Sequence, residues 1–234
     1  LVASQLVSCA PTFNAKLYAA SQTFDEARHV EAFNKYLQTR QGLMYPVGHG
    51  LKSLLDKILT DPRWDLKFIG MQIIIEGLAL AAFNLAKQTS NDPVFRDMLD
   101  LIIRDEARHV TFGVNYLEEY LKNLSQDELE ERALFAYEAC VVMRGRLLSA
   151  EVYEKFGWDV EEALEFQSKT DVTNNFQHLL FTRVVPNLSR IGLITEKVRP
   201  LYEELGVLEY ESWPTDGDID WVSLKQPLDL SESA

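Results

Sequence analysis

The chain has 234 residues, 47% of them hydrophobic, which is enough to bury a complete core in one domain. Its formal net charge of −13 argues against nucleic-acid binding, which needs a basic face. Cys9 and Cys140 fit neither a disulfide framework nor a metal-ligand spacing, and we expect reduced thiols in a cytoplasmic protein. The longest apolar stretch, Phe68–Leu85, is interrupted by polar side chains, so no membrane span and no signal segment are expected.

Glycine and proline are rare and separate long stretches of helical periodicity. Leu1–Ala10 predicts the end of a helix, and Phe13–Gln41 predicts one long helix. Gly42–Asp61 is interpreted as a crossover that contains a short amphipathic helix. The pair Asp61-Pro62 then predicts a helix start, because aspartate caps helices and proline favours their first turn. This helix is expected to run to about Thr89.

The next two helix starts are also marked by capping residues. Asn91-Asp92-Pro93 predicts a helix that runs to about Asn123. Ser125–Glu128 has the sequence of a capping box and predicts a helix that runs to about Phe156. No convincing period-two alternation occurs, so the sequence predicts an all-α fold.

The last third of the chain is predicted to be helical and then extended. Asp159–Leu205 indicates helices broken near Thr170 and Pro186. From Glu209 the chain becomes acidic and extended, and we expect a tail laid over the surface or onto a neighbouring subunit. The predicted organisation is one helical domain over residues 1–208 and an acidic tail over 209–234.

The hexapeptide Asp-Glu-Ala-Arg-His-Val occurs twice, at Asp25–Val30 and Asp105–Val110, and each copy contains Glu-x-x-His. Residues three apart on an α-helix share a face, so each copy can aim a carboxylate and an imidazole at one point. Two such helices, with glutamates from two others, form the dinuclear carboxylate sites of ferritin-like bundles. The candidate ligands are Glu26, His29, Glu106 and His109.

Glu76 is the third informative position, because it lies in the otherwise apolar stretch Phe68–Phe83. An ionised carboxylate there is costly unless it is paired or bound to metal. Glu76 precedes Glu106 by 30 residues, which suits adjacent antiparallel helices. The sequence therefore predicts a dinuclear metal site that includes Glu76.

The hypothesis gives each candidate ligand a role. Glu26 and Glu106 bridge two metals, His29 binds the first metal, and Glu76 and His109 bind the second. Carboxylates with one imidazole per metal suit iron or manganese, whereas zinc prefers tetrahedral nitrogen and sulfur ligands.

The other charged residues of the motif are candidates for a supporting layer. Metal-bound histidines usually donate their second ring N–H to a carboxylate or carbonyl. We therefore expect the aspartate of one motif helix to receive the histidine or arginine of the other. These supporting residues are Asp25, Arg28, Asp105 and Arg108.

The remaining histidines and the nearby aromatic residues have ordinary interpretations. His49 is interpreted as a polar loop residue, and His178 as a core or surface residue. For Phe33, Phe83 and Phe112 the default is core packing, and the alternative, that some line a substrate pocket, stays open.

The paired motifs, with Glu76 before the second, resemble the ferritin-like di-iron carboxylate superfamily over about Leu1–Leu124. The branch they resemble contains the small subunits of ribonucleotide reductase and the bacterial multicomponent monooxygenase hydroxylases. The resemblance implies a ferritin-like four-helix bundle with additional C-terminal helices. It also implies two iron ions, or a manganese–iron pair, held by Glu26, His29, Glu76, Glu106 and His109, with Asp25, Arg28, Asp105 and Arg108 behind them.

The chain departs from this family pattern in two ways. The pattern expects another acidic ligand about thirty residues before the first Glu-x-x-His. We expect it just upstream of Leu1; the alternative is that the first metal has one ligand fewer. Ribonucleotide reductase small subunits usually place a radical tyrosine one turn after the first histidine, where this chain has Phe33. A stable tyrosyl radical is therefore not expected at that position.

The leading hypothesis for function is an oxidoreductase that activates dioxygen to oxidise a small, apolar organic substrate. An external reductase or ferredoxin is expected to supply electrons, because no nucleotide-binding fingerprint is present. A cytoplasmic homodimer is expected. Two alternatives stay open: a ferroxidase or iron-handling protein, and a scaffold that has lost its metal.

Overall fold

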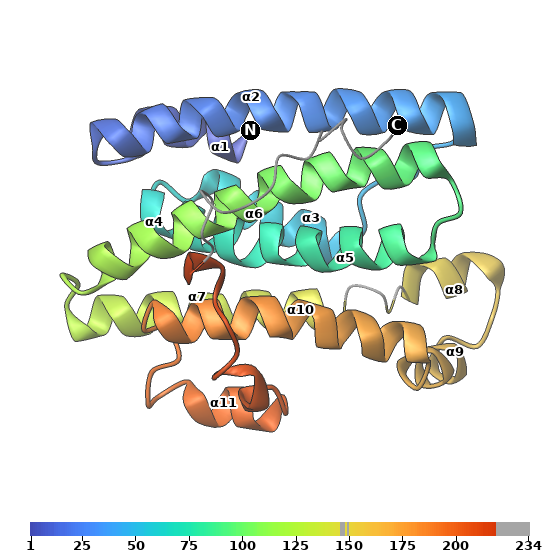
Figure 1. Ribbon diagram of the computed structural model, residues 1–234. Helices are drawn as coiled ribbons and strands as arrows, with labels where there is room; N and C mark the ends of the chain where they lie inside the picture. The colour runs from blue at the N-terminus through green and yellow to red at the C-terminus, as the bar shows by residue number, and fades with distance from the viewer. Residues whose placement is uncertain (146–147, 149, 219–234) are drawn as a thin grey trace.

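The computed structural model describes residues 1–145, 148 and 150–218, which form helices and no strand (Figure 1). The α-helices are α1 (Val2–Cys9), α2 (Phe13–Tyr36), α3 (His49–Thr60), α4 (Trp64–Phe68), α5 (Glu76–Thr89), α6 (Pro93–Leu121), α7 (Gln126–Arg144), α8 (Ala150–Phe156), α9 (Val160–Ser168), α10 (Asp171–Arg190) and α11 (Arg199–Glu204). The other helical segments are the π-helical η1 (Leu37–Gln41) and η2 (Ile69–Ile75) and the 3-10 turns η3 (Leu208–Tyr210) and η4 (Asp216–Asp218). The predicted all-α fold class is confirmed.

Helix α2 carries the first copy of the motif. The Thr12 hydroxyl accepts a hydrogen bond from the Ala15 N–H at 3.3 Å and caps the helix. After Tyr36 the helix continues as η1, and Gly42 ends it with a left-handed φ of 66°. The predicted helix over Phe13–Gln41 is confirmed, with a π-helical last segment.

The chain is helical from Trp64 to Thr89, through α4, η2 and α5. The predicted helix start at Asp61 is wrong. The Asp61 carboxylate instead accepts hydrogen bonds from the Arg63 backbone N–H at 2.8 Å and from its guanidinium at 3.0 Å. Asp61 therefore stabilises a turn, and the helix begins three residues later.

Helices α6 and α7 begin where the sequence predicts. Asp92 accepts a hydrogen bond from the Val94 N–H at 2.9 Å, and proline follows Asp92 in the first turn of α6. The capping box of Ser125 and Glu128 is present at the start of α7. The predicted continuation of α7 to Phe156 is wrong, because α7 ends before Gly145, a residue type that weakens helices.

Helix α10 differs from the prediction in its second half. The Thr170 hydroxyl accepts a hydrogen bond from the Thr173 N–H at 3.3 Å, so the predicted break near Thr170 is confirmed. The predicted break near Pro186 is wrong, since α10 continues to Arg190. Pro186 and the residues on either side of it are buried, and this packing compensates for the backbone hydrogen bond that proline cannot donate.

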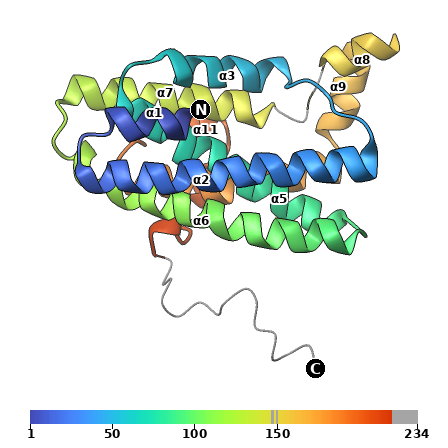
Figure 2. The same cartoon turned by 90° about the horizontal axis from the view of Figure 1, so that it is seen from above.

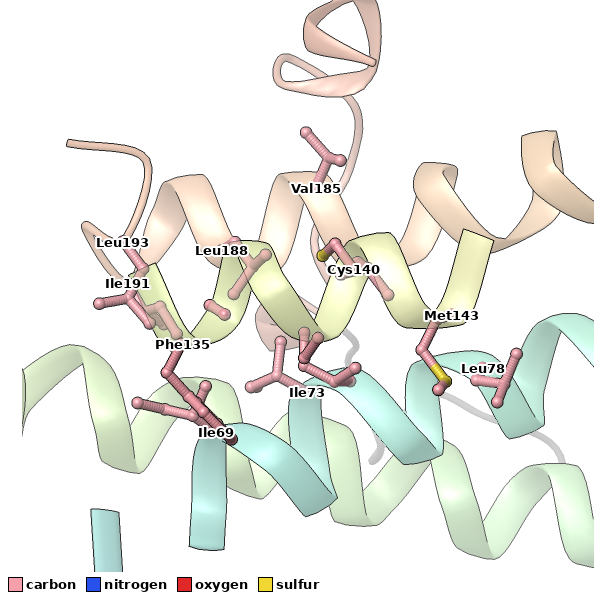
Figure 3. Close-up of a cluster of buried hydrophobic side chains, with 14 of the residues drawn as sticks. Ile69, Ile73, Leu78, Phe135, Cys140, Met143, Val185, Leu188, Ile191 and Leu193 are labelled. Carbon is pink, nitrogen blue, oxygen red and sulfur yellow. The ribbon is translucent and has the colours of Figure 1, made fainter. Parts of the chain in front are cut away.

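Consecutive helices pack along one another, and so do helices from distant parts of the chain. Helix α1 packs on α2, α5 packs on α6, and α2 contacts α6, while α10 covers α5 and α7 covers η2 (Figures 1 and 2). The core between η2, α7 and α10 is apolar (Figure 3). Its labelled members include Ile69, Ile73, Phe135, Cys140, Met143 and Leu188.

The stretch Trp64–Thr89 is long and apolar enough to cross a membrane, judged by length and composition only. Buried residues make up 61% of its most apolar window. A core helix of a folded domain has the same properties, so this stretch is weak evidence for a membrane span.

The start of the predicted tail is packed rather than extended. Asp216 is buried and accepts hydrogen bonds from Arg183 at 3.0 Å and from Asn187 at 2.7 Å, both on α10. The Asp216 carbonyl oxygen accepts a hydrogen bond from Thr111 of α6 at 2.8 Å. Residues 209–218 thus join α10 to α6, and the rest of the predicted tail, 219–234, lies outside the described residues.

Helices α8 and α9 form a peripheral pair. No described residue of either helix is buried. They contact each other, and α9 also contacts α10. Large apolar side chains remain exposed here, among them Phe156, Trp158 and Phe166.

Candidate metal centre

The two copies of the motif meet where α2 and α6 pack together, next to the first residue of α5, Glu76. One possible ligand atom from each of four side chains lies within 4.8 Å of the other three, and the group could hold a metal ion. These side chains are Glu26, Glu76, Glu106 and His109. Three are buried, and Glu26 is partly exposed.

His29 reaches the same group from α2. Its Nδ1 lies 3.1 Å from Glu106 Oε1 and 3.8 Å from Glu26 Oε2. His109 Nδ1 lies 3.6 Å from Glu106 Oε2, 3.8 Å from Glu26 Oε1 and 3.8 Å from Glu76 Oε1. Glu26 and Glu106 therefore each lie close to both imidazoles, and Glu76 lies on the side of His109.

Each of the five candidate ligands has a buried polar atom with no hydrogen-bond partner. These atoms are Glu26 Oε1, His29 Nδ1, Glu76 Oε2, Glu106 Oε2 and His109 Nδ1. Buried polar groups are almost always paired, because leaving one unpaired costs about 1–3 kcal/mol. Five such atoms in one cluster fit a site whose missing partners are metal ions.

The far side of each imidazole is held by the opposite motif helix. His29 Nε2 lies 3.1 Å from Asp105 Oδ2, and His109 Nε2 lies 3.2 Å from Asp25 Oδ2. With a proton on Nε2, each histidine donates to an aspartate, and its Nδ1, on the side of the glutamates, is the atom that would bind a metal once any Nδ1 proton is displaced. This arrangement fixes the tautomer and ring orientation that a metal ligand needs.

The two arginines of the motifs also form ion pairs between α2 and α6. Arg28 donates to Asp105 at 2.8 Å and to Asp25 at 2.9 Å. Arg108 donates to Asp105 at 2.5 Å and to Asp25 at 3.4 Å. Each aspartate thus contacts the histidine of the opposite motif helix and the arginines of both motif helices. The sequence predicted such contacts for the supporting layer.

These contacts shift the pKa of the candidate ligand His29 and the pKa of the supporting residue Asp105 in opposite directions. Burial favours neutral His29, but its contacts with Asp105, Glu106 and Glu26 prevail and raise the pKa of His29 to about 11. Burial also favours neutral Asp105, but contacts with His29 and Arg28 prevail and lower the pKa of Asp105 to about 2. At neutral pH the metal-free pair is an imidazolium beside a carboxylate.

The two most buried glutamates also differ. Burial, reinforced by the charges of Glu106 and Glu26, raises the pKa of Glu76 well above its ordinary value. Burial acts in the same sense on Glu106, but contacts with His109 and His29 outweigh it and lower the pKa of Glu106. The cluster therefore holds protons that a cation would have to displace.

Sequence reasoning missed one residue next to the cluster, Gln22. Its Nε2 donates to Glu76 Oε1 at 2.5 Å, and its Oε1 accepts from Gln72 Nε2 at 2.9 Å. Gln22 lies one helical turn before Glu26 on the same face of α2, so the motif's own periodicity could have identified it. Gln72 appeared in the sequence only as a polar interruption of an apolar stretch.

The other residues considered from the sequence lie around this cluster or away from it. Phe33 and Phe83 pack with ring centroids 5.4 Å apart, and Phe112 stacks on Tyr18 at 3.7 Å. His49 is exposed at the start of α3, and His178 contacts the Tyr210 hydroxyl at 3.0 Å. Neither histidine belongs to the cluster.

A surface cavity of about 320 Å³ lies beside the supporting layer. Its lining includes Tyr18, Asp25, Arg108, Thr111 and Phe112. The Tyr18 ring also meets the His109 ring edge-on, with centroids 6.3 Å apart. Two residues of the cavity lining, Tyr18 and Asp25, therefore contact the candidate ligand His109.

The acidic ligand expected before Leu1 stays a prediction. No protein-family model matches the chain, and no curated protein matches it significantly. The residues and geometry of the cluster are therefore the indication of function.

Proposed function

We propose that this protein is a ferritin-like di-iron oxidoreductase that uses dioxygen to oxidise a small, apolar organic substrate. The convergence of five buried ligand atoms without hydrogen-bond partners carries the proposal. Three carboxylates and two imidazoles suit iron, or a manganese–iron pair, better than zinc.

The proposal includes a ferritin-like four-helix bundle made of α1, α2, α5 and α6, to which the later helices are added. The packing of α1 on α2, of α5 on α6 and of α2 on α6 supports this arrangement. The positions of the candidate ligands support it too, since they come from α2, α5 and α6.

The chain's own residues have distinct roles in this proposal. Metal ions, when bound, supply the redox and Lewis-acid chemistry for reducing dioxygen. Glu26 and Glu106 would serve both ions, His29 would hold one ion, and Glu76 and His109 would hold the other. Asp25 and Asp105 orient the imidazoles through Nε2. The burial of Glu76, Glu106 and both histidines limits the access of water to this site.

Other parts of the proposal rest on the sequence. They are an external electron donor, either a reductase or a ferredoxin, a homodimeric assembly, and a cytoplasmic location. A fairly apolar substrate agrees with the phenylalanine rings near the motif helices, which include Phe33, Phe83 and Phe112.

The proposal is tested by loading the metal-free protein with Fe²⁺ under anaerobic conditions, counting bound iron, and then measuring dioxygen uptake. We expect two irons per chain and rapid uptake for the wild type. Glu106→Gln should lose both, because the amide keeps the shape but removes a charged ligand. Glu119→Gln is the matched control on the same helix, since Glu119 is exposed and outside the cluster.

The outcomes separate the three functional classes. Iron oxidised far beyond two equivalents per chain, inside a large hollow assembly, would favour the ferroxidase alternative. A wild type that binds neither iron nor manganese after supplementation would favour the scaffold alternative and remove the oxidoreductase proposal.

A further inference from the structure

Two carboxamide side chains are fully buried next to Glu76. Gln22 is 1% exposed and Gln72 is 0% exposed. They come from different elements, α2 and η2, yet they form one chain of hydrogen bonds that ends on the Glu76 carboxylate. Burying carboxamides is unfavourable unless they are paired, so their presence in this core calls for a physical explanation.

The two amide groups that donate, Gln72 Nε2 and Gln22 Nε2, set the direction of this series of hydrogen bonds. Gln72 Nε2 donates to Gln22 Oε1 at 2.9 Å, which turns the Gln22 amide so that its Nε2 points to Glu76 Oε1 at 2.5 Å. Glu76 Oε2 then remains without a partner. The pair thus determines which oxygen of Glu76 is held by protein and which is free.

A purely structural role explains this pair poorly. Gln72 Oε1 is buried and has no hydrogen-bond partner, a cost that an apolar residue of similar size would avoid. Gln72 is also tightly placed, because a Cβ on Gly113 of α6 would lie 2.5 Å from Gln72 Cβ. Its π-helical setting is of a kind often found at functional sites.

We propose that Gln22 and Gln72 are positioning residues, which hold Glu76 Oε1 through two hydrogen bonds in series and so fix the orientation of the Glu76 carboxylate at the metal site. This inference rests on the proposed function. Because Gln22 lies one turn from Glu26, α2 both supplies a ligand and orients the ligand of α5. The orientation of Glu76 therefore depends, through these two hydrogen bonds, on how α2 packs against the rest of the cluster.

The test is Mn²⁺ binding to the metal-free full chain, followed by the electron paramagnetic resonance signal of free and bound Mn²⁺. Gln22→Met keeps the side-chain length and removes the hydrogen bonds. We expect one of two Mn²⁺ ions to bind about 10- to 100-fold more weakly, the usual effect of losing a ligand's hydrogen-bonded support. The spectrum of the bound ions should also change.

Gln72→Met provides the specific readout, because Gln72 is not hydrogen-bonded to Glu76. Alone it should weaken the same ion, and added to Gln22→Met it should have no further effect, since both act through one path. The matched control is Asn187→Leu. Asn187 is another buried carboxamide that donates to a carboxylate, that of Asp216, outside the cluster. It should lower stability and leave Mn²⁺ affinity unchanged.

The results distinguish this inference from the proposed function. A wild type that binds no Mn²⁺ and no Fe²⁺ would remove both. A wild type that binds two ions, with unchanged affinity and spectrum in folded Gln22→Met, would overturn the positioning role alone. If Gln22→Met does not fold, Gln72→Met decides in the same way.

Discussion

Glu76 and His29 both hold protons in the metal-free centre, for different physical reasons. Burial and the neighbouring carboxylates Glu106 and Glu26 raise the pKa of Glu76 well above its ordinary value. Contacts with Asp105, Glu106 and Glu26 overcome the effect of burial and raise the pKa of His29 from 6.5 to about 11. A metal ion that binds these two groups must first displace their protons.

Metal affinity is therefore expected to fall as the pH is lowered, because protons compete for Glu76 and His29. Isothermal titration of Mn²⁺ into the metal-free protein, in two buffers of different ionisation enthalpy, measures the protons released. The apparent heat should depend on the buffer. Buffer-independent heats, together with an affinity unchanged from pH 6 to pH 8, would contradict the expected proton release.

The sign of the stability effect is opposite in the metal-free protein. A raised pKa of His29 means that its protonated form stabilises the fold. This contribution is complete below pH 6.5 and is lost as the pH rises towards 11. Metal binding and the metal-free fold thus favour different protonation states of the same imidazole.

At this scale the sequence predicted much of the cluster and missed its connections. The repeated motif identified four candidate ligands, because the same Glu-x-x-His spacing on two helices allows both pairs of side chains to meet at one point. The helical periodicity could place Gln22 beside the cluster but could not reveal its role, since that depends on Glu76 and Gln72, which are at least 50 residues away in the chain. Such a contact is set by tertiary packing.

Among the elements, α6 and η2 approach each other closely at Gly113. A Cβ there would lie 2.5 Å from Gln72 Cβ and 3.1 Å from Gln72 Cγ. Gly50 of α3 provides a contrast, because its added Cβ would meet Val142 at an ordinary 3.6 Å. The same substitution should therefore have different effects at the two positions.

Gly113→Ala is expected to destabilise the fold by about 1–3 kcal/mol, the usual cost of overpacking, although alanine favours helices. Gly50→Ala should leave stability unchanged or raise it by up to about 1 kcal/mol. Urea unfolding of both variants measures the difference. Equal stability of the two variants would show that the approach of α6 to η2 tolerates a methyl group.

Helix boundaries set by local contacts were predicted better than those set by tertiary packing or by competing turns. The side chains of Asp92 and Ser125 bond to their own helices, so local sequence is sufficient to place them. Pro186 was misjudged because its burial in α10 depends on distant helices. Asp61 was misjudged because its carboxylate favours a turn with Arg63 over a helix cap.

For the whole molecule, the cluster joins helices that are far apart in the chain. Glu26 of α2, Glu76 of α5 and Glu106 of α6 lie within one group. A ligand that binds only the folded state stabilises it by about 2.7 kcal/mol at a hundredfold excess over its dissociation constant. Bound metal should therefore stabilise the packing of all three helices together.

Saturating Mn²⁺ is expected to raise the Tm of the wild type by roughly 5–10 °C, given the usual Tm response of a chain of this size. Differential scanning fluorimetry with and without Mn²⁺ measures the shift. Glu106→Gln should lose most of it, and the exposed control Glu119→Gln should keep it. A full shift in Glu106→Gln would place the ion elsewhere in the molecule.

The exposed helices α8 and α9 form a peripheral part of the molecule that can be altered without changing the core. The helices on either side are joined directly, since Gln177 of α10 donates to the Arg144 carbonyl oxygen of α7 at 3.3 Å. No described residue of α8 or α9 contributes to the buried core. A fluorescent reporter or an affinity tag inserted between these two helices would therefore signal from the periphery while the interior stays intact.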